Sequence, residues 1–128
     1  MKLLLDTHLL LWSAGEPHQL SKDAHTLISN KENQLYFSAA SLWEITIKQS
    51  LGCDDFQVNP RLLYRGLIEN DYLELTIESR HAVAIDSLPK IHKDPFDRIL
   101  VAQATVEAMT LLTADKMIAH YPGSIKLV

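Results

Sequence analysis

The stretch KLLLDTHLLLWSA, residues 2–14, decides the fold class of this chain. It begins with a short apolar run, Lys2 to Leu5, which is typical of a strand buried on both faces of a parallel sheet. An apolar segment of helical length, residues 7–14, follows at once and ends at Gly15-Glu16-Pro17. A buried strand followed directly by a helix indicates an α/β protein.

The same alternation continues along the rest of the chain. Further strands are predicted at residues 35–37, 72–75, 109–113 and 125–127. Further helices are predicted after Ser21, from about 41 to 52, at 60–70 and 78–87, after Asp94, and at 115–119. Short strands that alternate with helices predict an α/β fold around a mainly parallel sheet.

Length and composition indicate one ordinary folded domain over residues 1–128. The chain is 47% hydrophobic and 22% charged, and its 12 Lys and Arg against 16 Asp and Glu give a net charge of −4. This balance excludes a strongly basic nucleic-acid-binding protein, although it allows a local basic patch. A single cysteine suits a reducing cytosol, and the apolar runs fall short of the roughly 20 residues of a membrane span. We therefore expect a cytoplasmic protein without membrane contact.

Four acidic residues occupy special positions in these predicted elements. They are Asp6 at the end of the first strand, Glu44 and Asp97 in first turns of helices, and Asp115 just after the 109–113 strand. In open α/β sheets, ligands bind beyond the carboxyl ends of the strands, where loops from several strands meet. All four side chains can therefore point toward one end of the sheet.

Each acid also has a structural interpretation. Glu44 completes a capping box with the serine three positions before it, and Asp94 is suited to cap its own helix. Asp97 gains roughly 0.3–1 kcal/mol from the helix dipole, and Asp115 can cap a short helix. Asp6 is harder to explain in this way, because burying a charge without a partner is costly.

Mutual repulsion favours a metal site over four separate structural roles. Two carboxylates about 4 Å apart repel each other by roughly 4 kcal/mol at an effective dielectric constant of 20. A cluster of four therefore stays ionised only beside a cation. Mg²⁺ fits best because it prefers oxygen ligands, and Mn²⁺ is a close substitute if His8 or His92 lies nearby.

Basic residues near these acids have two interpretations each. Lys48 lies four residues after Glu44, where an ordinary helical ion pair is favoured over a phosphate contact at the rim. The turn around residues 94–97 is surrounded by further basic side chains, namely Lys90, His92, Lys93 and Arg98. They either hold a nucleic-acid backbone or form a solvated loop.

The remaining chemistry-bearing residues give no site. His18, His25, His81 and His120 lack metal-ligand spacing and are interpreted as surface or helix-end residues. The chain has neither a GxSxG motif nor a glycine-rich phosphate loop.

Large apolar residues crowd two of the predicted helices, and they are Leu10, Leu11, Trp12, Leu42 and Trp43. Tight packing onto the sheet is the commoner outcome for such residues. The alternative is an apolar groove that binds a partner.

Four segments carry a family resemblance, and together they span almost the whole chain. They are LLLDTHLLLW at 3–12, SLWEITIK at 41–48, HKDPFDRILVAQA at 92–104 and LLTAD at 111–115. In order and spacing they resemble a PIN domain, specifically the VapC-like toxins of bacterial type II toxin–antitoxin systems. The resemblance implies a three-layer α/β/α fold around a parallel sheet and an Mg²⁺-dependent endoribonuclease.

The resemblance also implies a set of site residues and partners. The acidic quartet of the family corresponds to Asp6, Glu44, Asp97 and Asp115 as catalytic and metal-binding residues. Thr113 matches a hydroxyl position beside the site, and Asp94 matches a second acid that is either a ligand or a helix cap. The implied partners are an RNA substrate, a small antitoxin whose C-terminal segment blocks the site, and a second copy in a homodimer.

Several alternatives stay open at this point. We expect Asp6 and Asp97 to bind metal directly, with Glu44 and Asp115 completing the site and one of them orienting the attacking water. The number of ions is open. A non-catalytic RNA-binding module on the same fold and a nuclease that acts on DNA are the alternative functions.

Overall fold

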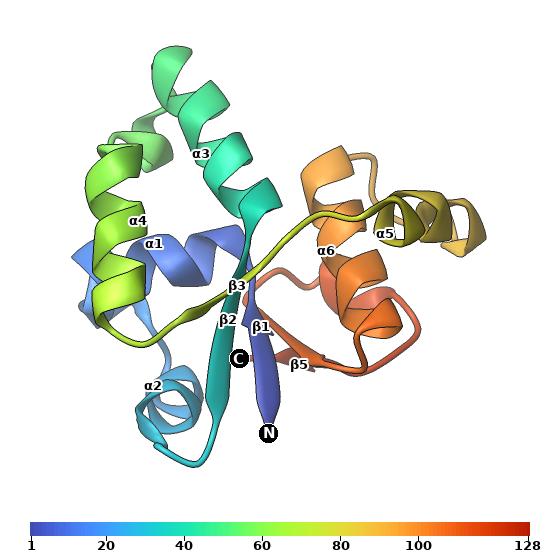
Figure 1. Ribbon diagram of the computed structural model, residues 1–128, viewed down its shortest axis with the longest axis horizontal. Helices are drawn as coiled ribbons and strands as arrows, with labels where there is room; N and C mark the ends of the chain where they lie inside the picture. The colour runs from blue at the N-terminus through green and yellow to red at the C-terminus, as the bar shows by residue number, and fades with distance from the viewer.

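A parallel five-stranded sheet forms the middle of the computed structural model, which describes residues 1–128 (Figure 1). The strands are β1 (Lys2–Leu5), β2 (Gln34–Ser38), β3 (Leu73–Leu75), β4 (Thr110–Thr113) and β5 (Ile125–Leu127). Their order is β3-β2-β1-β4-β5, and every neighbouring pair is parallel. From β1 the chain adds β2 and β3 on one side and then β4 and β5 on the other, so the strand order reverses between β1 and β4. In α/β proteins, ligands usually bind at such a point.

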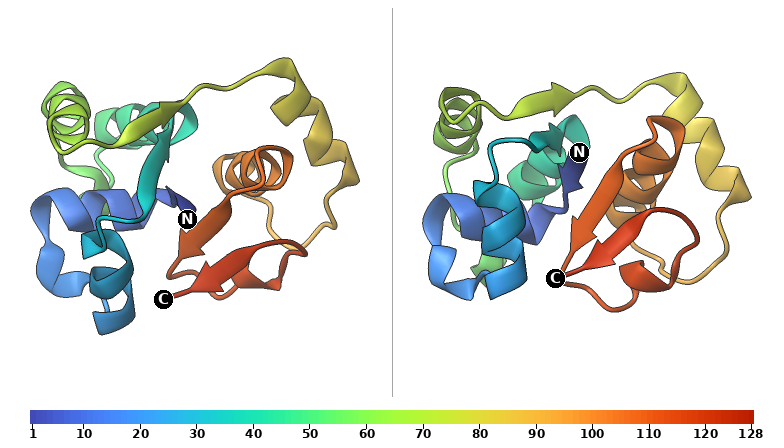
Figure 2. Two further views of the ribbon diagram at one scale, coloured as in Figure 1. Left: turned by 60° about the horizontal axis from the view of Figure 1, so that its bottom comes forward. Right: turned by 90° about the horizontal axis from the view of Figure 1, so that it is seen from below.

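Six helices form the two outer layers (Figure 2). One group comprises α1 (Thr7–Gly15), α2 (Lys22–Ser29), α3 (Ala39–Ser50) and α4 (Pro60–Glu69). The other comprises α5 (Ser79–Ala84) and α6 (Pro95–Val106). The predicted three-layer α/β/α fold is confirmed. None of these helices has the length and apolar character needed to traverse a bilayer.

The leucine run that opens the chain contributes to both cores. Leu3 and Leu5 pack with the α1–α4 group, whereas Leu4 packs with α6 on the opposite face. All three side chains are fully buried. Successive strand residues face opposite sides, so a central strand covered on both faces needs an uninterrupted apolar run.

Helix α3 begins earlier than the sequence pattern predicts. Its cap is Ser38, whose hydroxyl accepts a hydrogen bond from the Ala40 amide. Ser41 lies inside the helix, where its hydroxyl accepts from Thr7. The predicted capping box at Ser41 is therefore wrong, and Glu44 lies in the second turn rather than the first.

The predicted helix at 115–119 is also wrong. The Asp115 side chain accepts a hydrogen bond from the Met117 amide, which turns the chain just after β4. Only a 3₁₀ turn, Ile118–His120, follows. The predicted helix at 78–87 is likewise divided into α5 and a 3₁₀ turn, Ile85–Ser87. The remaining short 3₁₀ turns are Pro17–Gln19 and Asp54–Phe56.

Candidate active site

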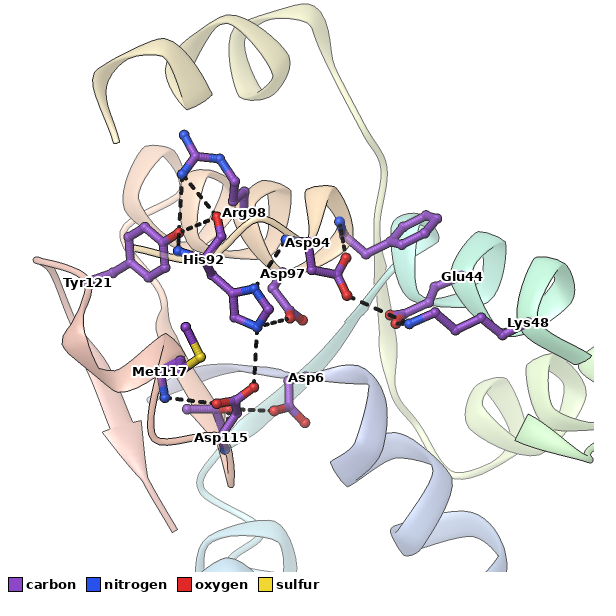
Figure 3. Close-up of polar contacts among 12 residues, drawn as sticks. Asp6, Glu44, Lys48, His92, Asp94, Asp97, Arg98, Asp115, Met117 and Tyr121 are labelled. Atoms are coloured by element: carbon purple, nitrogen blue, oxygen red, sulfur yellow. Dashed lines mark hydrogen bonds and ion pairs between the residues drawn. The ribbon is translucent and has the colours of Figure 1, made fainter. Parts of the chain in front are cut away.

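The four predicted acids meet in one pocket of about 180 Å³ at the carboxyl ends of β1 and β4 (Figure 3). Asp6 follows β1, Asp115 lies beyond the end of β4, Glu44 projects from α3, and Asp97 projects from the first turn of α6. The pocket is also lined by Thr7, His8, Lys48, His92, Asp94 and Ile118. Residues far apart in sequence thus form a single, strongly acidic cluster.

Asp6 is fixed in place through both of its carboxylate oxygens. Oδ1 caps α1 by accepting from the Leu9 amide at 2.9 Å, and Oδ2 accepts from the Thr113 hydroxyl at 2.5 Å. The side chain is buried, and this burial raises the pKa of Asp6, although the Thr113 hydrogen bond opposes the rise. Thr113 therefore lies beside the site, where the sequence places it, and orients the first acid.

Asp97 also has a strongly raised pKa. Burial raises its pKa from 3.8 to about 7, and the charges of Asp94, Glu44, Asp6 and Asp115 add to the rise. This carboxylate therefore keeps its proton to a much higher pH than an ordinary aspartate does. A divalent cation would relieve this repulsion and displace that proton.

The Glu44 side chain is buried, and only one of its two carboxylate oxygens has a hydrogen-bond partner. Its Oε2 accepts from Lys48 Nζ at 2.5 Å. Its Oε1 is buried and has no hydrogen-bond partner. An unsatisfied buried carboxylate oxygen costs roughly 1–3 kcal/mol or more. This atom is the strongest structural sign that the pocket accommodates a cation.

Lys48 is the internal countercharge of the cluster. Besides pairing with Glu44, its Nζ lies 3.7 Å from Asp94 Oδ2 and 4.9 Å from the centre of the Phe56 ring. Burial lowers the pKa of Lys48, but the hydrogen bond with Glu44 and the surrounding carboxylates outweigh it, so the net shift is upward. The predicted helical ion pair with Glu44 is confirmed. The sequence does not predict the second contact, with Asp94.

Asp94 caps α6, since its Oδ1 accepts from the Phe96 amide at 2.9 Å. Its other oxygen faces Lys48 (Figure 3). The cap interpretation is therefore confirmed. The same side chain also lines the pocket, so the geometry leaves it one oxygen for an additional role.

His92 points its ring into the pocket. Its Nε2 lies 3.2 Å from Asp97 Oδ2 and 3.6 Å from Asp115 Oδ2, while Nδ1 accepts from the Asp94 amide. That amide contact keeps Nδ1 without a proton and directs Nε2 toward the two acids. The possible ligand atoms of His92, Asp97 and Asp115 all lie within 4.8 Å of one another, which is close enough for one metal ion.

The basic rim differs from its predicted arrangement. The Arg98 guanidinium donates to the carbonyl oxygens of Pro89 and Ile85 at 2.9 and 3.3 Å and to the Tyr121 hydroxyl at 3.2 Å. Figure 3 shows it on the far side of His92 from Asp6. Arg98 therefore anchors the loop before α6 and is not positioned for the expected phosphate contact. Lys90 and Lys93 are exposed beside that loop.

His81 lies in the first turn of α5, as the helix-end interpretation predicts, but it is not a surface residue. It is fully buried, its Nδ1 accepts from the Glu78 amide, and its Nε2 lies 2.7 Å from Glu107 Oε2. Glu78 and Glu107 both pair with Arg80, so each carboxylate of this second cluster already has a cationic partner. The spacing from Glu78 to His81, which forms a capping box at the start of α5, is the signal that could have revealed it.

The crowded apolar residues are divided between core and surface. Leu10 and Leu11 are buried in the core, as the packing interpretation predicts, and Trp12 and Leu42 are partly buried against it. Trp43 is 58% exposed, with its ring edge-to-face against Phe96 at 5.2 Å.

Three solved structures share this fold, each over at least 97% of both chains. VapBC2 from Rickettsia felis, bound to a DNA fragment from its promoter, matches with a TM-score of 0.75 at 14% identity, covering 100% of this chain and 99% of that one. DNA-bound VapBC from Salmonella typhimurium matches at 0.68 and 16% identity, covering 98% of this chain and 97% of that one. VapBC-1 from nontypeable Haemophilus influenzae matches at 0.61 and 16% identity, covering 99% of this chain and 98% of that one.

Sequence comparison gives the family. No curated protein matches the chain significantly. The PIN domain family profile, however, matches residues 3–124, a range that includes all four acids of the pocket. The chain therefore belongs to the PIN domain family.

Proposed function

We propose that this protein is the toxin of a type II toxin–antitoxin system and that it acts as a divalent-metal-dependent endoribonuclease. The observation that carries the proposal is the pocket in which Asp6, Glu44, Asp97 and Asp115 meet. Membership of the PIN domain family supports a nuclease. The likeness to the VapBC structures supports a toxin of that type.

The residues of the pocket fit a divalent cation. The donors are carboxylate oxygens, which suit Mg²⁺ and which Mn²⁺ also accepts. The unsatisfied Glu44 Oε1 and the raised pKa of Asp97 both indicate missing positive charge. When bound, such an ion polarises the phosphodiester and stabilises the oxygen that leaves.

The protein's own residues then have distinct tasks. Asp6 and Asp97 bind the ion directly, with Thr113 holding Asp6 in orientation. Glu44 completes the site with its free oxygen while Lys48 holds the other.

Asp115 is the acid best placed to orient the attacking water. Its side chain is 41% exposed, whereas that of Glu44 is 4% exposed and is paired with Lys48. A water molecule can therefore reach Asp115 and pass a proton toward its carboxylate. His92 Nε2, 3.6 Å away, keeps that carboxylate turned into the pocket.

A cognate antitoxin is the proposed protein partner, because the matching structures are described as VapBC assemblies. Two further expectations are a homodimer, which the family resemblance implies, and a cytoplasmic location, which the composition implies. Light scattering of the isolated protein measures the first, and fractionation of the host cell measures the second.

The test compares cleavage of a single-stranded RNA and of a DNA with the same sequence. We expect Mg²⁺ to support RNA cleavage, EDTA to abolish it, and Asp97→Asn to reduce it by at least about a hundredfold. The matched control is Asp86→Asn, which removes an exposed carboxylate from a 3₁₀ turn outside the pocket. RNA binding without cleavage would identify a non-catalytic module, and preferential cutting of DNA would identify a DNA nuclease.

A further inference from the structure

A second cavity, of about 560 Å³, adjoins the acidic pocket. The two share Asp6, His8 and Asp115. One wall of the larger cavity is a face of α1 that continues into the turn after it, and the opposite wall is formed by residues 54–58. Its volume falls in the range of roughly 300–1,000 Å³ that is typical of sites for small organic ligands.

The helix wall of this cavity is aromatic. His8 and Trp12 are one turn apart on α1, with ring centroids 5.8 Å apart, and both are only partly buried. The ring of Phe56 packs edge-on against His8 at 5.4 Å and supports it from the core. Flat, partly exposed rings beside a nuclease site are the surfaces on which unpaired RNA bases stack.

The opposite wall supplies hydrogen-bond acceptors. Asp54 and Asp55 are exposed, line the cavity, and take part in none of the ion pairs or side-chain hydrogen bonds of the structure. No lysine or arginine lines the cavity. A phosphate is therefore repelled, whereas a group that presents hydrogen-bond donors is attracted.

We propose that this cavity binds one guanine base of a single-stranded RNA, next to the phosphodiester held in the acidic pocket. Trp12 stacks on the base, His8, whose ring is tilted by 51° from that of Trp12, contacts the side of the base, and Asp54 or Asp55 accepts hydrogen bonds from its edge. Guanine fits because its N1–H and N2–H donate side by side, which matches the two oxygens of one carboxylate. None of the other three bases presents two adjacent donors on its Watson–Crick edge, and a carboxylate repels the acceptors that these edges carry.

The assignment rests on the proposed function, because it places the base beside the bond that is cut. The shared residues Asp6, His8 and Asp115 put the two sites within one nucleotide of each other. A cationic side chain of a protein partner is the competing occupant of an acidic cavity. The volume and the partly exposed ring of Trp12 favour a flat heterocycle over one side chain.

The binding test uses Trp12 as its own reporter. Trp43→Phe leaves Trp12 as the only tryptophan, and guanosine, adenosine, cytidine and uridine, which carry no phosphate, are titrated against its fluorescence. We expect saturable quenching by guanosine with a dissociation constant about tenfold below those of the other three nucleosides. The double variant Asp54→Asn/Asp55→Asn is expected to remove this preference. Asp23→Asn/Asp86→Asn, which removes the same charge from exposed positions elsewhere, is expected to keep it.

Cleavage mapping provides the second readout. An oligouridine RNA with one internal guanosine is expected to be cut beside that guanosine by the wild-type protein and at dispersed positions by Asp54→Asn/Asp55→Asn. Selective guanosine binding without RNA cleavage would overturn the proposed function and leave the base site standing. RNA cleavage with equal affinity for all four nucleosides would overturn the base site alone. Tighter quenching by N-acetylarginine amide than by guanosine would also overturn it, in favour of a cationic protein segment.

Discussion

Asp97 shows most directly how the carboxylates of the pocket repel one another. Its carboxylate is held among four other acids by the rigid first turn of α6, so it cannot move away from them. Its pKa is about 7 in the folded chain, against an ordinary value of 3.8. Between these pH values, the folded chain keeps a proton that the unfolded chain has released. The free energy of unfolding of the metal-free protein therefore falls as pH rises through this window.

Asp97→Asn removes this charge while keeping the shape of the side chain. In EDTA at pH 7, we expect the variant to be more stable than the wild type by about 1–3 kcal/mol, a range reduced for solvent screening. Its melting temperature is expected to vary less between pH 4 and pH 7. Thermal melts across this pH range test both points. A wild-type melting temperature that is flat with pH, or a less stable variant at pH 7, contradicts the account.

Lys48 supports a second prediction, since it is the only cation paired with buried Glu44. Lys48→Met leaves that carboxylate unpaired, and we expect a loss of about 2–4 kcal/mol of stability in EDTA. Mg²⁺ is expected to restore much of this loss because the ion takes over as countercharge. Urea unfolding with and without Mg²⁺ measures the effect.

Glu44→Gln/Lys48→Met is the matched control for this prediction. The double variant has no unpaired charge, so its stability in EDTA is expected to lie above that of Lys48→Met alone. Equal stabilities for the two variants would show that the pair does not carry the energy assigned to it.

At the scale of elements, Gln103 joins the two helices that carry Glu44 and Asp97. On α6, its Oε1 accepts from the hydroxyl of Ser38, the cap of α3, at 2.6 Å. Its Nε2 donates to the Thr76 carbonyl oxygen at 3.3 Å. The side chain is fully buried, so this small network sets how α3 and α6 lie relative to each other.

Gln103→Leu keeps the volume of the side chain and removes its hydrogen bonds. We expect a loss of about 1–3 kcal/mol, because buried polar groups are left unsatisfied. We also expect weaker Mg²⁺ binding by about tenfold, because the acids on α3 and α6 lose their fixed spacing. Calorimetric Mg²⁺ titration tests this, with exposed Gln49→Leu on α3 as the control. Unchanged Mg²⁺ affinity in a less stable protein would reduce Gln103 to a purely structural role.

Most of the helices and strands can be predicted from local sequence patterns. Asp94 followed by Pro95 marks the start of α6 because both residues suit a helix N-terminus, and the structure begins the helix there. The sequence pattern places the start of α3 too late, because Ser38 and Ser41 are both plausible caps. Ser38 is the cap because β2 ends there, and the end of β2 depends on its pairing with β3, which the local sequence does not show. The buried environment of His81 depends in the same way on Glu107, 26 residues away.

At the scale of the whole molecule, the parallel topology brings the acids together. The neighbouring strands β1 and β4 place Asp6 and Asp115 at one sheet edge, and α3 and α6 bring the other two acids to it. The sequence predicts that each acid lies near a strand or helix end, and the family resemblance selects the set. Neither the sequence nor the resemblance reveals that Lys48 contacts Asp94 or that Arg98 anchors the loop before α6, because both depend on loop conformations.

The central claim is that these acids bind a divalent ion together. The most direct test is a crystal of the protein soaked with Mn²⁺, with anomalous density measured at the manganese edge. The account predicts a peak within coordination distance of both Asp6 and Asp97. A fully soaked crystal with no peak in the pocket, or with its only peak at the Glu78, His81 and Glu107 cluster, would contradict it.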